Sequence, residues 1–68
     1  MMVTVNGQPY DFSPGLTLSE ILIQIDLPSD QSGVAIAHNG VVVARRAWPQ
    51  VALDDGDRVE IVGAMQGG

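Results

Sequence analysis

The chain has 68 residues, enough for one small domain. Its eight acidic residues, three arginines and lack of lysine give a net charge of −5, which argues against nucleic acid or an anionic membrane surface as a partner. The lack of cysteine excludes disulfides, and a single histidine leaves too few ligands for a structural zinc site. The fold must therefore depend on an apolar core, for which a hydrophobic content of 46% suffices.

No apolar run approaches the roughly 18 residues needed to span a membrane. Residues 1–7 lack the basic start and apolar centre of a signal peptide. We therefore expect a cytoplasmic protein. Its acidic surface either steers it toward a basic patch on a partner or serves solubility alone.

The N-terminal region predicts a β-hairpin. Residues 2–5 include β-forming side chains, and Asn6-Gly7 follows, a pair in which both residues tolerate a positive φ. The returning strand, residues 8–12, contains Pro9, which cannot donate a hydrogen bond to a neighbouring strand. This strand is therefore expected at an edge of the sheet.

The next segment predicts one helix of two to three turns. Thr17 and Glu20 have the spacing of a capping box, in which each side chain binds the other residue's backbone amide. Ile23 lies off the apolar stripe and is expected to be partly exposed, and Pro28 ends the helix because it disfavours α geometry in the residue before it. The stripe has helical spacing and contains Leu18, Ile21, Leu22 and Ile25.

A second hairpin is predicted in the middle of the chain. In residues 34–39 larger side chains alternate with small ones, and the turn signal Asn39-Gly40 follows. Three valines then form the returning strand. Small side chains suit a sheet where a helix lies close across it, so Ala35 and Ala37 are candidates for the helix-facing side. The alternation by itself fits either face.

The last third of the chain predicts a turn and a final strand. Residues 45–50 are expected to be irregular apart from at most one helical turn, with Trp48 covering the core. Residues 54–57 form a tight turn with Gly56 at positive φ. Residues 58–62 alternate polar and apolar side chains, as a half-buried strand does.

The order β-β-α-β-β-(irregular)-β indicates an α+β fold. A last strand lying beside the first, in the centre of the sheet, gives the β-grasp plan, a mixed sheet of about five strands over one α-helix. We expect a β-grasp domain in residues 1–62 and a flexible C-terminal tail in residues 63–68 that ends in Gly-Gly.

Short segments spread over the whole chain form a pattern that is specific in combination. They are Val5-Asn6-Gly7, residues 16–22, residues 34–40, Val43-Ala44-Arg45 before Trp48, residues 55–61 and Gly67-Gly68. With these residues the chain resembles the ThiS family, the sulfur carriers of thiamin biosynthesis. Ala44 departs from the pattern, since such proteins often have proline there, and this bears on local stiffness alone.

The resemblance implies a ubiquitin-like β-grasp fold and a reaction cycle at the C-terminus. The carboxylate of Gly68 would be adenylated by an ATP-using, ubiquitin-activating-like adenylyltransferase. A persulfide sulfur donor would convert it to a thiocarboxylate, and the sulfur would pass to thiazole synthase. The chain would then be a substrate and carrier with no bound cofactor, not an enzyme.

The residues suit this chemistry. An ionised carboxylate is a poor electrophile, and the chain has no Gly-rich phosphate loop or P-loop lysine with which to activate it. Without cysteine, the C-terminal carboxyl is the remaining site for sulfur. Residues 63–68, extended, reach roughly 20 Å. Gly67 has no Cβ and fits a narrow channel, Met65 offers an adaptable apolar anchor, and Gln66 lies between them as a further recognition residue for partners.

Other functions remain open at this point. Within the same group the alternatives are the small subunit of molybdopterin synthase, another ubiquitin-like sulfur carrier, or a modifier joined to lysines. The alternative of another class is a passive β-grasp interaction module without chemistry at the tail.

Three other features have a plainer interpretation beside a functional one. His38 is a general base or a packed strand residue, and Arg45-Arg46 binds an acidic group or forms a solvated rim. Residues 54–57 lack the twelve-residue loop of a calcium site and fit a turn. The exposed apolar candidates for docking are Ile23 and Leu27.

Overall fold

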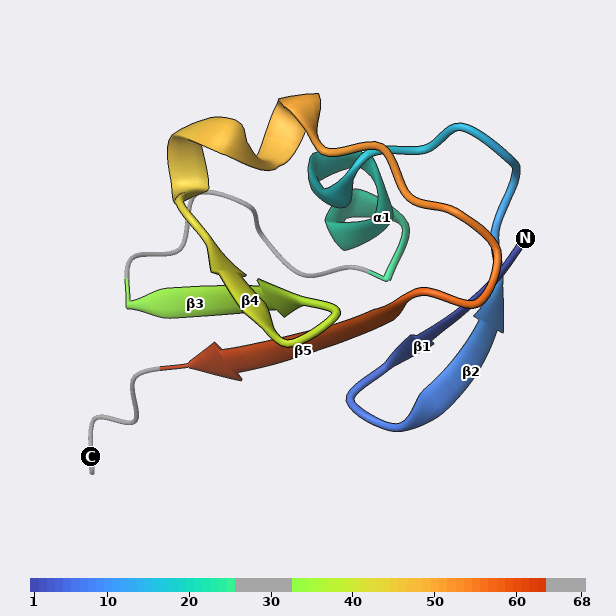
Figure 1. Cartoon of the computed structure of the whole chain (residues 1–68), viewed down its shortest axis with the longest axis horizontal. Helices are drawn as coiled ribbons and strands as arrows, with labels where there is room; N and C mark the ends of the chain where they lie inside the picture. Colours follow the sequence, from blue (N-terminus) through green and yellow to red (C-terminus); the bar gives the residue numbers. More distant parts are fainter. Residues whose placement is uncertain (26–32, 64–68) are drawn as a thin grey trace.

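The computed structural model describes residues 1–25 and 33–63. In these residues a five-stranded sheet is covered on one face by an α-helix and a 3-10 helix (Figure 1). The elements are β1 (Met2–Val5), β2 (Gln8–Asp11), α1 (Leu18–Gln24), β3 (Val34–His38), β4 (Val41–Val43), η1 (Arg45–Gln50) and β5 (Arg58–Gly63). The predicted α+β fold, a mixed sheet over one α-helix, is confirmed.

The last strand lies in the centre of the sheet, whose order is β2-β1-β5-β3-β4. β5 is parallel to β1 and antiparallel to β3. β2 is at an edge, as Pro9 predicted, and among the strands of the described residues it pairs with β1 alone. The two hairpins therefore flank β5, one on each side.

Both predicted hairpin turns are confirmed. Asn6 and Gly7 have φ values of 52° and 82°, and Asn39 and Gly40 have 51° and 85°. Two consecutive positive φ values match the twist of the flanking strands, which explains the choice of Asn-Gly in both places.

The capping box also forms as predicted. The backbone N–H of Glu20 donates to Oγ1 of Thr17 at 3.3 Å, and the N–H of Thr17 donates to Oε1 of Glu20 at 2.8 Å. The helix ends at Gln24, and Ile23 is 68% exposed, as expected. The predicted stop at Pro28 lies outside the described residues.

The interpretation of β3 in which the alanines face the helix is wrong. Ile36 is fully buried, whereas Ala35 is exposed. Burying an isoleucine side chain stabilises the fold by about 1.5–3 kcal/mol, far more than burying a methyl group, so Ile36 decides the face. The core that it joins contains Val3, Val5, Phe12, Leu18, Ile21, Leu22, Trp48, Leu53 and Val59.

The segment before β5 is more regular than predicted, because Arg45–Gln50 forms a 3-10 helix. Trp48 covers the core with 2% exposure, as expected. Its Nε1–H donates to the carbonyl of Val43 at 2.9 Å, so the one polar atom of the indole is satisfied inside the fold. In the described part of the chain, no helix combines the length and apolar character needed to cross a membrane.

Candidate functional site

The sequence places the candidate site at the end of β5. Gly68, the predicted site of modification, and the recognition residues Met65, Gln66 and Gly67 lie outside the described residues. The structure therefore defines the base of the site, up to Gly63. This residue is still paired with Val34 of β3, so the strand includes the position at which we expected the tail to begin.

β5 points away from the end of the molecule at which the N-terminus lies (Figure 1). On one side it pairs with β3 from Val59 through Gly63. On the other side the paired residues of β1 reach only as far as Val5, opposite Val59. The strand that leads to the predicted site is thus supported unequally by its two neighbours.

Two turn asparagines bind β5 through their side chains. Oδ1 of Asn6 accepts from the backbone N–H of Ile61 at 2.8 Å. Oδ1 of Asn39 accepts from the backbone N–H of Arg58, also at 2.8 Å. The sequence predicted both turns but not these contacts, and its one hint was asparagine, not glycine, at the first turn position in both hairpins.

A polar network surrounds the turn that precedes β5. Nε2 of His38 lies 2.7 Å from Oδ2 of Asp57, and Oδ1 of the same carboxylate accepts from Nδ2 of Asn39 at 3.1 Å. The backbone N–H of Asp54 also donates to Oδ2 of Asp57, at 2.9 Å. His38 therefore joins β3 to this turn, which fits its interpretation as a packed strand residue.

The same network shifts the pKa of Asp57. Burial by itself raises it, but hydrogen bonds from His38, the Asp54 backbone and Asn39, with the charge of His38, together hold it below its ordinary value of 3.8. The carboxylate is therefore ionised at neutral pH and serves as a hydrogen-bond acceptor for the turn.

The other candidates find plain structural roles. Gly56 has a φ of 91°, so the predicted turn is confirmed. Within residues 1–25 and 33–63, no three His, Asp or Glu side chains are grouped so that they could hold a metal ion. Arg45 and Arg46 are exposed, and the guanidinium of Arg45 lies 4.9 Å from the centre of the Trp48 ring.

An exposed apolar strip lies on the face of the sheet opposite the helices. Ala35 pairs with Val62, and Ala37 pairs with Val42, so these four residues share that face. Val62 is 63% exposed and Val42 is 72% exposed. Sequence reasoning missed this strip because it left the face of β3 open, with the alanines as candidates for the helix-facing side. The bulk of the intervening isoleucine was the signal that could have revealed the strip.

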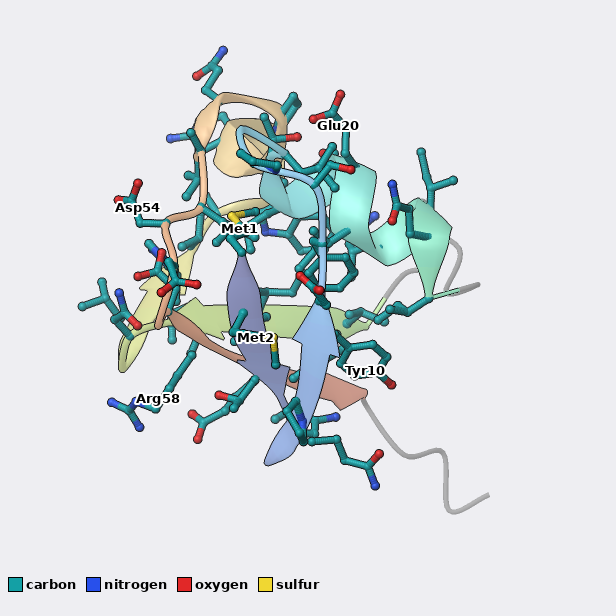
Figure 2. All side chains as sticks on the ribbon, turned by 90° about the vertical axis from the view of Figure 1, so that its right-hand side faces the viewer. Met1, Met2, Tyr10, Glu20, Asp54 and Arg58 are labelled. Carbon is teal, nitrogen blue, oxygen red and sulfur yellow. The ribbon has the colours of Figure 1, made fainter. Side chains whose placement is uncertain are left out.

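The strip lies next to the base of the candidate site and continues into charged residues. Along β5 it is followed by Glu60 and Arg58, which alternate with the buried Val59. Figure 2 shows Arg58 on the side of the sheet away from Glu20 and the helix. Of the predicted docking residues, Ile23 is exposed on the helical side and Leu27 lies outside the described residues.

Comparisons with known proteins agree on one family. The family model for the ThiS family matches residues 3–68. The sulfur carrier protein ThiS of Escherichia coli (strain K12) is 34% identical over 68 residues, which cover 100% of both chains. The crystal structure of the thiamine biosynthesis protein (ThiS) from Geobacter metallireducens matches with a TM-score of 0.83 and 33% identity, also over 100% of both chains.

A much longer protein contains a similar segment. The thiazole synthase of Paramagnetospirillum magneticum (strain ATCC 700264 / AMB-1) is 34% identical over 68 residues, which cover 100% of this chain and 20% of that protein. The chain therefore spans about a fifth of the length of this relative.

Proposed function

Because the chain belongs to the ThiS family, we propose that it is a sulfur carrier protein of thiamin biosynthesis. The observation that carries this proposal is the agreement with a sulfur carrier over the full length of both chains. The β-grasp fold and the Gly-Gly end of the sequence support it.

The proposed chemistry takes place on the carboxylate of Gly68. An ATP-using, ubiquitin-activating-like adenylyltransferase joins this carboxylate to AMP and releases pyrophosphate. The terminal sulfur of a persulfide donor then displaces AMP and forms an acyl disulfide with the donor. A thiol attacks the donor's own sulfur, so that the S–S bond breaks, a disulfide joins thiol and donor, and the thiocarboxylate is released. AMP is needed because an ionised carboxylate resists attack by a nucleophile and has no good leaving group.

The composition supports this assignment of roles. The chain has no cysteine, so a side-chain persulfide is excluded and the terminal carboxyl is left to hold the sulfur. It also has no lysine, and thus no side-chain ε-amine that could capture the activated terminus. In this proposal the protein is a substrate of its partners, binds no cofactor itself, and works in the cytoplasm, where ATP is available to the activating enzyme.

Thiazole synthase is the proposed recipient of the sulfur. A thiazole synthase that contains a segment resembling the whole of this chain supports a partnership between the two. Joining a carrier to its recipient raises the effective concentration of one near the other, which is useful when the two must meet in every cycle. The exposed apolar strip with Val62 lies beside the base of the tail and offers a surface for such contacts.

Intact-mass spectrometry tests the proposal directly. The chain is incubated with ATP, a ubiquitin-activating-like enzyme and a persulfide donor. We expect a mass increase equal to replacement of one oxygen by sulfur, located on the C-terminal peptide. A variant that lacks Gly68 is the matched control and should remain folded but unmodified.

The alternatives predict other outcomes. A passive interaction module would keep its partner affinity without Gly68, and a modifier would appear as a conjugate on lysines of other proteins. If the truncated chain restored growth without thiamin to a cell that lacks its own carrier, or if an enzyme active on its own carrier left the mass of the chain unchanged, the sulfur-carrier proposal would be wrong.

A further inference from the structure

The strand that leads to the C-terminus depends on a side chain for part of its support. On the β1 side, strand pairing with β5 ends at Val5 and Val59, because the chain enters the hairpin turn at Asn6. Residues 60–63 would then be held by β3 alone, although the reactive end of the chain follows them directly. The side chain of Asn6 adds a hydrogen bond to β5 from the β1 side.

The side chain of Asn6 takes the place of a missing strand residue. In a parallel ladder, one residue donates its N–H to the neighbouring strand and accepts at its carbonyl from a residue further along that strand. The N–H of Asn6 follows this pattern and donates to the carbonyl of Val59 at 2.9 Å. The φ of 52° carries its own carbonyl into the turn, and Oδ1 accepts from the N–H of Ile61 instead, at 2.8 Å.

Asn39 repeats the arrangement at the other end of β5. Its N–H donates to the carbonyl of Arg58 at 2.8 Å, and its Oδ1 accepts from the N–H of Arg58 at 2.8 Å. Both asparagines thus extend a ladder from the first position of a hairpin turn. Asn39 acts where β5 begins, whereas Asn6 acts close to Gly63, where β5 ends.

We propose that Asn6 is a positioning residue that fixes the end of β5, so that the tail starts from a defined point when the activating enzyme binds it. This inference rests on the proposed function. Within the described residues 1–25 and 33–63, the hydrogen bond to Ile61 is the last one from the β1 side before Gly63. Without it the end of β5 is held on the β3 side alone, and the carboxylate occupies the reactive position in a smaller share of encounters.

Substitutions at the two turns separate this role from a general effect on stability. Asn6→Gly and Asn39→Gly both keep a residue that accepts a positive φ, and both remove one acceptor for a β5 amide. Asn39→Gly also removes the contact with Asp57, so it disturbs the fold at least as much. Asn6→Asp is the conservative variant, because a carboxylate oxygen can accept from Ile61 and Asp tolerates this turn position.

The assay is ATP–pyrophosphate exchange by a ubiquitin-activating-like enzyme at varied concentrations of the chain. We expect Asn6→Gly to lower kcat by about five-fold, the factor that corresponds to one hydrogen bond of typical net strength. KM should change by less than about two-fold, because the substitution removes a hydrogen bond within the fold and adds or removes no charge. Asn39→Gly and Asn6→Asp should both stay within about two-fold of the unsubstituted chain in kcat.

Amide hydrogen exchange of the free protein gives a second readout. Asn6→Gly should speed exchange at Ile61 and leave Arg58 protected, and Asn39→Gly should do the reverse. The inference is overturned if Asn6→Gly keeps full kcat while Ile61 exchanges faster, or if Asn39→Gly loses as much kcat as Asn6→Gly. If the unsubstituted chain is not adenylated by an enzyme that is active on its own carrier, the proposed function fails, and the delivery role fails with it.

Discussion

Replacing Ile36 tests which face of β3 holds the core. Its side chain is fully buried, and it pairs with Val43 and Ile61 on the two neighbouring strands. Truncation of such a residue to alanine costs about 2–5 kcal/mol. A domain of this size has a total stability of about 3–10 kcal/mol, so Ile36→Ala brings it close to unfolding. Ile36→Val is the measurable change, because it removes one methyl group and costs about 1 kcal/mol.

The assay is urea unfolding followed by the fluorescence of Trp48, which is 2% exposed in the folded state and enters water on unfolding. With a slope near 1 kcal/mol per M, Ile36→Val lowers the midpoint by about 1 M. Val42→Ala is the matched control on the opposite face of the same hairpin. Its side chain is 72% exposed, so its cost should stay within about 0.5 kcal/mol.

Ala35→Leu completes the test. Overpacking a core costs about 1–3 kcal/mol, whereas an added side chain on the exposed face should change the midpoint little. If Ala35→Leu destabilised the domain more than Ile36→Val did, the face assignment of β3 would be refuted.

Three further predictions use the same unfolding assay. Asp57→Asn should lower the free energy of unfolding at neutral pH. Because the folded-state pKa of Asp57 lies below 3.8, the stabilising contribution of its carboxylate is fully present above pH 3.8 and is lost as the pH falls through the lowered pKa. The difference in unfolding free energy between the variant and the unsubstituted protein should therefore close in acid. An unchanged gap at low pH would contradict this linkage. Thr17→Ala should cost about 1 kcal/mol by removing the helix cap, with Thr17→Ser as a control that restores most of it. Gly56→Ala should cost about 1 kcal/mol because its φ of 91° disfavours any Cβ, although open space surrounds the position; a neutral result would mean that the turn relaxes.

Local chemistry made much of the fold readable from the sequence. Asn-Gly pairs specify their own backbone angles, and Thr17 and Glu20 satisfy each other within one helical turn. Gly56 marks a turn because, like the Asn-Gly pairs, it adopts a positive φ. These signals depend on residues next to one another, so they gave the strand and helix order without knowledge of the tertiary fold.

Interactions across the sheet could not be read in this way. The alternation of β3 fitted either face until Ile36 was seen in contact with the core, and the apolar strip with Val62 followed from that choice. The 3-10 helix before β5 is held partly by the hydrogen bond from Trp48 to Val43, which depends on how the indole enters the core.

The sequence by itself therefore determined the order of the elements and both Asn-Gly turns. Its choice of the C-terminal carboxyl of Gly68 as the reactive group stays a prediction. Only the tertiary structure decided which face of the sheet is buried and how β5 is held before Gly63. The physical reason is separation along the chain. Asn6 and Ile61 are 55 residues apart, and their hydrogen bond exists only because folding places the first turn beside the last strand.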